Sequence, residues 1–269
     1  MLSKTIGFVG AGQMAKALAS GMVASQLVPA KGVIAYDPTP AAAESFADQI
    51  PGAVIESDNA AVAKRAEVIV LAVKPQVVQT VLAQLGPEVE QRHLVISIAA
   101  GVTIATIQAG LPQARVVRVM PNTPCLVGFG ASAYALGNSA TPADSDTVRQ
   151  LLESVGIALQ VDEKLLDAVT GLSGSGPAYV FTMIEALSDG GVRAGLPRSV
   201  ATALAVQTVR GAAEMVATSH EHPAVLKERV TSPGGTSIAG LQAAEEHGLR
   251  AALIAAVQAA TNRSIELGG

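Results

Sequence analysis

The sequence predicts an α/β domain with a parallel sheet, followed by an all-helical domain. Up to about residue 162, short β-branched runs alternate with segments of helical spacing. The β-branched runs are nearly continuous, as in strands that helices cover on both faces. After Asp162 the strand signals stop, and the long segments are helical in composition. We therefore expect a first domain over residues 1–162 and a second over 163–269.

The strands of the first domain are expected in a regular order. A strand within "TIGFVG" precedes a helix from Gln13 to about Ser25. Further strands are predicted at 32–36, 66–73, 93–99 and 114–120, and the runs at 131–136 and 157–161 can extend the sheet. Strands that alternate with helices are typical of crossover connections between parallel strands.

The helices of the second domain are unusually apolar. The helical segments are "EKLLDAVTGL", "PAYVFTMIEALSDGGVRAGL", "RSVATALAVQTVRGAAEMVATS" and "LRAALIAAVQAATNRSIEL". Several of them are apolar on more than one face, and a helix that is apolar nearly all round must be buried. A helical segment of this length cannot bury that surface within one chain, which indicates a partner subunit.

Composition excludes several classes of function. Apolar residues make up 49% of the chain, which is enough for a sizeable core, and the net charge of −4 provides no basic face for nucleic acid. The apolar runs, such as the one at 68–73, are far too short to span a membrane. Gln13 and Lys16 interrupt the apolar N-terminal stretch, so we interpret it as part of the mature fold.

Cysteine and histidine usage gives no sign of a metal site. Cys125 is the only cysteine, so no intramolecular disulfide can form, which fits a reducing cytoplasm. The four histidines match no ligand pattern of the HExxH kind, and we expect no metal. His220 and His222 flank Glu221, but a solvated loop is the favoured interpretation of that segment.

The N-terminal segment carries a glycine motif between a predicted strand and a predicted helix. Gly10, Gly12 and Ala15 fit G-x-G-x-x-[G/A], and Asp37 ends the second strand. In a Rossmann-type domain these glycines permit a tight turn and a close approach of the pyrophosphate to the helix N-terminus. The context favours dinucleotide binding over a structural turn, or over a flavin or S-adenosylmethionine pocket.

Six colinear segments extend this interpretation over nearly the whole chain. They are "GFVGAGQMAKAL", "LAVKPQ" (71–76), "SIAAGVTI" (97–104), "RVMPNTP" (118–124), "GLSGSGPAYVF" (171–181) and "SPGGTSIAGL" (232–241). Together they resemble pyrroline-5-carboxylate reductases, and the last two are the most specific. The resemblance implies reduction of 1-pyrroline-5-carboxylate to L-proline with NADPH or NADH, the last step of proline biosynthesis. It also implies a homodimer with interleaved helices, which can build larger rings.

The resemblance assigns residues to two sites. It places the substrate carboxylate on Ser232, Gly234, Gly235 and Thr236, with Ser175 as a further substrate contact. It assigns the catalytic contact with the ring nitrogen to Ser237, where several relatives carry threonine. From the residues alone, an ordinary helix cap is the favoured explanation of the "SPGGTS" segment, and the resemblance reverses that preference. The implied cofactor residues are Gly10, Gly12, Gln13, Met14, Asp37, Asn59, Ala72, Val73, Lys74, Pro75, Ala100 and Asn122.

Some of these residues have plain alternatives. Lys74 can be a solvated surface lysine, and Asn122 can be a turn residue before Thr-Pro. Cys125 has no histidine partner within sequence reach, so we interpret it as a small buried residue. Asp37 can accept from ribose hydroxyls and would repel a 2′-phosphate, so better use of NADH than the family average is expected.

Two other functions remain open. In β-hydroxyacid dehydrogenases a catalytic lysine follows a similar glycine motif, and Val180 occupies that position here. Valine argues against that reaction, because oxidation of an alcohol needs a group that takes the hydroxyl proton, whereas reduction of an imine does not. The other alternative is a non-catalytic dinucleotide-binding sensor, which would have no use for a second anion site at "SPGGTS".

Overall fold

The computed structural model describes residues 2–268, which form two compact units. The first unit comprises Met1–Ser175 together with Ala259–Gly269, and the second comprises Gly176–Gln258. The end of the chain therefore belongs to the first unit, where the Ser264 hydroxyl donates to Asp167 Oδ1 at 2.7 Å. The predicted domains, 1–162 and 163–269, divide the chain by function and not by compactness, so their bounds differ from those of the two units. They stay a prediction.

The first unit is built on one sheet that, within the described residues, has eight strands in the order β3-β2-β1-β4-β5-β6-β7-β8. The strands are β1 (Ile6–Val9), β2 (Val33–Tyr36), β3 (Val54–Ile55), β4 (Val68–Leu71), β5 (Leu94–Ser97), β6 (Arg115–Met120), β7 (Gly130–Leu136) and β8 (Gly156–Gln160). The predicted parallel pairing is confirmed from β3 to β6. β7 instead pairs antiparallel with β6, because the short segment η3 (Thr123–Val127) replaces a crossover helix.

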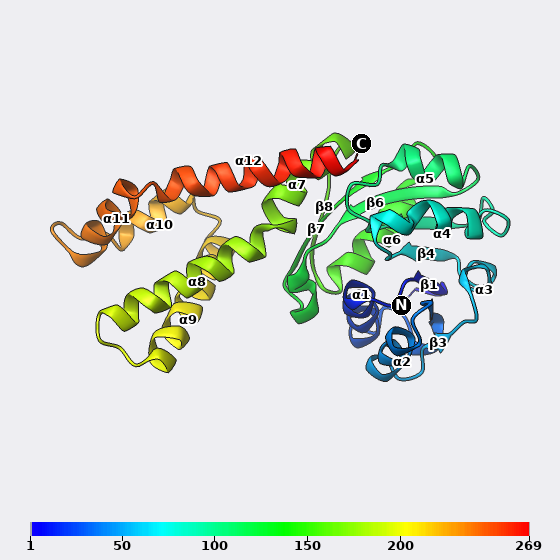
Figure 1. Ribbon diagram of the computed structural model, residues 1–269, viewed down its shortest axis with the longest axis horizontal. Coiled ribbons are helices and arrows are strands. Elements are labelled where there is room, and N and C mark those ends of the chain that lie inside the picture. Colours follow the sequence, from blue (N-terminus) through cyan, green and yellow to red (C-terminus); the bar gives the residue numbers. More distant parts are fainter. Residues whose placement is uncertain (1, 269) are drawn as a thin grey trace. The chain divides into compact units, whose positions relative to one another are not determined.

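Helices cover both faces of this sheet, as the continuous apolar runs predict (Figure 1). One face packs against α1 (Gln13–Ala24), α2 (Pro40–Gln49) and α6 (Pro142–Glu153), and the other packs against α3 (Asn59–Arg65), α4 (Val78–Leu85) and α5 (Ile104–Gly110). Side chains alternate between the two cores: Val70 of β4 packs in the first and Leu71 in the second. Short 3₁₀ segments, η1 (Ala30–Gly32) and η2 (Pro75–Val77), precede β2 and α4.

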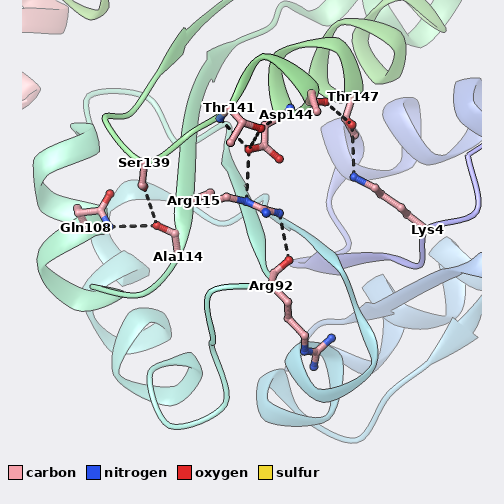
Figure 2. Close-up of polar contacts among 10 residues, drawn as sticks. Lys4, Arg92, Gln108, Ala114, Arg115, Ser139, Thr141, Asp144 and Thr147 are labelled. Atoms are coloured by element: carbon pink, nitrogen blue, oxygen red, sulfur yellow. Dashed lines mark hydrogen bonds and ion pairs between the residues drawn. The ribbon is translucent and has the colours of Figure 1, made fainter.

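Polar contacts hold the amino ends of the parallel strands together (Figure 2). Arg115, the first residue of β6, donates to the Arg92 carbonyl oxygen at 3.1 Å. Its Nε lies 3.3 Å from Asp144 Oδ2, and Asp144 forms a capping box with Thr141 at the start of α6. Because this cluster occupies the amino edge, the carboxyl edge is left for ligands.

The chain turns helical after β8, but not as one regular helix. The segment predicted as "EKLLDAVTGL" consists of a 3₁₀ turn η4 (Glu163–Leu165), α7 (Leu166–Val169) and a π turn η5 (Thr170–Gly174). The Ser175 amide closes the π turn by donating to the Thr170 carbonyl oxygen at 2.8 Å. Composition cannot distinguish these forms, because their residues are equally compatible with an α-helix.

The second unit is helical, as predicted. It contains α8 (Gly176–Arg193), α9 (Arg198–Ser219), α10 (Pro223–Arg229), α11 (Thr236–Glu246) and the first part of α12 (Leu249–Gly268). α8 and α9 lie side by side, where Gly191 allows a close approach to Ala201 (Figure 1). Among the described residues, none of the helices combines the length and the apolar character that crossing a bilayer requires.

The helices of the second unit leave large apolar side chains exposed. Phe181 is 65% exposed, Leu204 55% and Ile254 68%. The buried apolar residues that are described within this unit are Ala201, Ala205 and Leu226. The excess of apolar surface that the sequence predicts is therefore present in the folded chain.

Candidate active site

A cleft of about 370 Å³ lies at the carboxyl edge of the sheet, within the first unit. It is lined by Gly12, Gln13, Met14, Ala72, Val73, Lys74, Ile98, Met120, Pro121, Asn122, Thr123 and Gly174. These residues end or follow β1, β4, β5 and β6, or belong to the π turn. Between β1 and β4 the strand order reverses, since β2 and β3 lie on the other side of β1. Ligands of open α/β sheets bind at such a switch point.

The glycine motif forms one wall of the cleft. Gly10 has φ +97°, and a Cβ at this position would lie 2.7 Å from the Ala72 carbonyl oxygen. Only glycine therefore fits between the β1 and β4 ends. Gly12 is the N-cap of α1, and a Cβ there would meet no atom of the described residues within 4 Å. The first amides of α1 are thus open to an anion in the cleft.

Asp37 is fixed beside the glycine loop at the end of β2. Its Oδ2 accepts from the Ala11 amide at 2.9 Å, and its Oδ1 accepts from the Thr39 amide at 2.9 Å. The second contact is an Asx turn, in which an aspartate side chain accepts from the amide two residues later. The carboxylate therefore faces the loop with both oxygens already held, while each oxygen keeps lone pairs for a further donor.

Asn122 joins separate parts of the cleft wall. Its Oδ1 accepts from the Ala131 amide at 2.9 Å, and its Nδ2 donates to the Ser173 carbonyl oxygen at 3.1 Å. The side chain is 7% exposed. Asn122 also precedes the 3₁₀ segment η3, so the turn position before Thr-Pro that the sequence left open is occupied by a buried residue of the cleft wall. Lys74 is exposed at the mouth of the cleft, with its backbone in extended conformation before η2.

Five predicted cofactor residues do not line this cleft: Gly10, Asp37, Asn59, Pro75 and Ala100. Gly10 and Asp37 support the loop, as described. Asn59 is buried at the start of α3, where its amide donates to Gln84 Oε1 at 2.7 Å. Ala100 is exposed after β5. A cofactor role for these residues stays a prediction.

The predicted substrate residues, apart from Ser175, lie in the second unit. α11 begins at Thr236, and its N-cap is Gly235. The Gly235 amide donates to the Ser232 carbonyl oxygen at 3.0 Å, which closes the turn before the helix. Because the capping position is a glycine, neither Thr236 nor Ser237 is an ordinary side-chain cap. Ser175 follows the π turn as the last residue of the first unit's main segment.

The remaining cysteine and histidine candidates are explained by burial or by contacts within the chain. Cys125 is 2% exposed in η3, and burial raises the pKa of its thiol, which lowers the share of the reactive thiolate. His222 caps α10 by accepting from the Ala224 amide at 3.2 Å, and Glu221 forms a bidentate ion pair with Arg229. Within residues 2–268, no three His, Cys, Asp or Glu side chains gather as metal ligands.

Sequence reasoning missed five lining residues: Ile98, Met120, Pro121, Thr123 and Gly174. Met120, Pro121 and Thr123 flank Asn122 in the quoted "RVMPNTP" segment, so proximity in sequence could have identified them. Gly174 belongs to the "GLSGSGPAYVF" segment, from which only Ser175 is assigned to a site. Its place in the cleft depends on the π turn, which gives no compositional signal.

Comparison with known proteins matches both halves of the chain. Residues 163–267 match a family model described as pyrroline-5-carboxylate reductase dimerisation, and residues 5–101 match one described as NADP oxidoreductase, coenzyme F420-dependent. The chain is 45% identical to the pyrroline-5-carboxylate reductase of Pisum sativum, covering 98% of this chain and 96% of the relative. It is 46% identical to that of Synechocystis, with 99% of each chain covered.

Solved structures agree over the full length. A crystal structure of Plasmodium falciparum pyrroline carboxylate reductase with NADP bound has 34% sequence identity and a TM-score of 0.90, covering all of both chains. A pyrroline-5-carboxylate reductase from Coxiella burnetii has 33% identity and a TM-score of 0.93, again covering all of both chains.

Proposed function

The chain belongs to the pyrroline-5-carboxylate reductase family, and on this premise we propose how its residues carry out the NAD(P)H-dependent reduction of a cyclic imine to L-proline. The observation that carries the proposal is the cleft at the switch point between β1 and β4, with the open N-terminus of α1 beside it. When bound, NAD(P)H supplies the hydride for the C=N carbon. A protonated imine is already a good electrophile, so the chain needs no strong base.

We assign the cofactor to this cleft. A side chain at Gly12 would project into open space there, so the glycine leaves a cradle that a pyrophosphate can fill. Gln13 and Met14 would contribute the first amides of α1, and Ala72, Val73 and Lys74 would border the ribose beside the nicotinamide. Gly10, Asp37, Asn59, Pro75 and Ala100 complete the proposed cofactor contacts, and Asn122 belongs to the proposed cofactor site as a residue of the cleft wall.

We assign the substrate to the segment before and within the first turn of α11. The amides at this helix start would bind the substrate carboxylate, since a helix N-terminus attracts anions. Ser232, Gly234, Gly235 and Thr236 are the proposed contacts, and Ser175 is a further one. The Ser237 hydroxyl would hydrogen-bond the ring nitrogen and orient the C=N bond for hydride transfer.

One assay tests this function. The purified chain is mixed with NADPH or NADH, and loss of the reduced-nicotinamide absorbance is followed with pyrroline-5-carboxylate, with a 2-keto acid, or with no second substrate. Rapid oxidation with pyrroline-5-carboxylate alone is expected. Oxidation with only the 2-keto acid would support a β-hydroxyacid dehydrogenase, and cofactor binding without turnover would support a sensor.

Self-association is the first prediction, and we propose a homodimer made through residues 163–269. The exposed apolar side chains of α8, α9 and α12 and the match to a dimerisation model support it. Such interfaces commonly bury more than about 2,000 Å² in total. Light scattering at micromolar concentration should give at least twice the chain mass of 27.1 kDa, including larger rings of dimers. A monodisperse monomer would contradict the proposal.

Cofactor choice is the second prediction, and we expect relatively good use of NADH. A 2′-phosphate ~5 Å from the Asp37 carboxylate would be repelled by roughly 3 kcal/mol per charge at an effective dielectric of about 20, before solvent screening. The residues after Asp37 are Pro38, Thr39 and Pro40, which offer no cation. Replacing Asp37 by serine should shift kcat/KM toward NADPH.

Two controls separate charge from loop geometry. Asp37→Asn removes the charge but keeps an acceptor for one of the two amides that Asp37 holds, so it should also shift preference toward NADPH. Asp48→Asn makes the same chemical change at an exposed position of α2 and should leave the preference unchanged. A kcat/KM for NADPH more than about tenfold above that for NADH in the unaltered chain would refute the prediction.

We also propose a cytoplasmic location. Cys125 is a free, buried thiol, which is compatible with a reducing compartment.

A further inference from the structure

Three side chains, at every second residue from the end of β6 onward, contact the segment that leads from β8 to the cleft and hold it in place. The first is Arg118, which is 5% exposed. Its guanidinium lies 3.4 Å from Glu163 Oε1 and 3.7 Å from Asp167 Oδ1. Arg118 therefore attaches both η4 and α7 to the sheet by ion pairs in which the arginine is buried and the two carboxylates are partly exposed.

The second position is Met120, two residues further along the strand. A Cβ at Gly174 would lie 2.5 Å from Met120 Cε, so the π turn packs its backbone directly against this side chain. Met120 also packs against the small buried cluster that Leu166 of α7 forms with Ala133 and Ala135 of β7. Both Met120 and Gly174 line the cleft.

The third position is Asn122, which holds the π turn by a hydrogen bond rather than by packing. Its Nδ2 donates to the Ser173 carbonyl oxygen, one residue before Gly174. Its Oδ1 is held by the Ala131 amide at the start of β7, so the amide group has a fixed orientation. With Nδ2 toward Ser173, the buried Asn122 side chain donates to the carbonyl oxygen of a partly buried residue.

A π turn depends on such outside contacts. One extra residue per turn makes this conformation rare, and it is usually kept where surrounding structure requires it. At its carboxyl end, the turn of residues 170–174 is closed by the π-type hydrogen bond from the Ser175 amide to the Thr170 carbonyl oxygen. The carbonyl of Ser173, inside this turn, is held by Asn122. Loss of that contact would allow the turn to relax toward α-helical geometry, which would move Gly174.

We propose that Asn122 is a positioning residue that fixes the π turn, so that the Gly174 wall of the cleft has its shape before the cofactor arrives. This inference rests on the proposed cofactor role of the cleft. It differs from a direct contact of Asn122 with the nicotinamide, because one amide hydrogen and one oxygen lone pair are already used within the chain. Asn122 acts through Ser173 and Gly174.

Replacing Asn122 by aspartate tests the proposal. The carboxylate still accepts from the Ala131 amide but turns an oxygen toward the Ser173 carbonyl oxygen, so the contact becomes repulsive. In the full chain without cofactor, amide hydrogen exchange should become faster across 170–175 and stay unchanged across β1 and α1. The Kd for NADPH should rise about tenfold, which corresponds to 1.4 kcal/mol. Asn138→Asp, the same change at an exposed loop position, should alter neither measurement.

The outcomes distinguish the possible roles. Weaker NADPH binding with unchanged exchange across 170–175 would overturn the proposal and favour a direct cofactor contact. Faster exchange with unchanged NADPH affinity would also overturn it, since the turn would then not shape the site. If the aspartate variant unfolds, Asn122→Ala removes the contact without repulsion and should show the same two changes in smaller degree. The exchange measurement needs no turnover, so failure of pyrroline-5-carboxylate reduction would refute the proposed function alone.

Discussion

Replacing Ser237 by alanine is expected to lower kcat/KM for pyrroline-5-carboxylate by roughly 10- to 150-fold. In the proposed role, the hydroxyl contacts the ring nitrogen, where amine character develops as the hydride arrives. A hydrogen bond to a charged group contributes about 1.5–3 kcal/mol, and this range gives the expected factor. Ser237→Thr should stay within about threefold of the unaltered chain, because a threonine retains the hydroxyl.

The position of Ser237 in α11 separates chemistry from stability. Because the N-cap is Gly235, loss of the Ser237 hydroxyl removes no capping side chain. The melting temperature and the affinity for NADH should therefore barely change. Ser199→Ala, in the first turn of α9 within the same unit, is the matched control for a serine lost at a helix start. A destabilised but fully active Ser237→Ala variant would assign this serine a structural role only.

Replacing Gly10 by alanine should damage both the fold and cofactor binding. At φ +97° an alanine is strained by about 1–2 kcal/mol, and its methyl group would collide with the Ala72 carbonyl oxygen. The overlap adds about 1–3 kcal/mol. In a chain of this length the melting temperature should fall by roughly 5–15 °C. NADPH binding should be lost or greatly weakened, since the β1 and β4 ends must move apart.

Gly12→Ala is the companion variant, because it changes the cleft without straining the chain. Gly12 has φ −71°, and its added methyl group meets no described atom within 4 Å. The melting temperature should stay within about 1 °C of the unaltered chain, while the Kd for NADPH should rise at least about tenfold, as the backbone can no longer approach the pyrophosphate. Unchanged NADPH affinity in this variant would place the pyrophosphate elsewhere.

Local patterns account for most of the fold that could be predicted. The β-branched runs identify β1, β2 and β4 to β6, because strands covered on both faces need apolar side chains on both sides. β3 was not predicted as a defined strand, since Val54 and Ile55 are too few to form a pattern. The reversal at β7 follows from a short connection whose residues do not specify strand direction.

The cleft could be predicted only where its residues share a local motif. The glycine loop is identifiable because the positive φ of Gly10, the close approach of its backbone to Ala72 and the start of α1 all involve the residues of one short motif. The π turn is not, because its geometry depends on Arg118, Met120 and Asn122, which are about fifty residues away along the chain. The roles of Ser232–Ser237 depend on the family resemblance, because a helix start after a turn has the same sequence pattern with or without a ligand.

The return of α12 to the first unit sets the order in which the protein can assemble during synthesis. Ser264 reaches back to Asp167, so the cofactor-binding unit includes residues that leave the ribosome after the whole of the second unit. Contacts across such a sequence separation form late, because the intervening chain must first be brought together. The nascent first unit therefore remains incomplete, with its last contacts unmade, while Gly176–Gln258 emerges, and under the proposed homodimer this second unit is the part that meets a second copy.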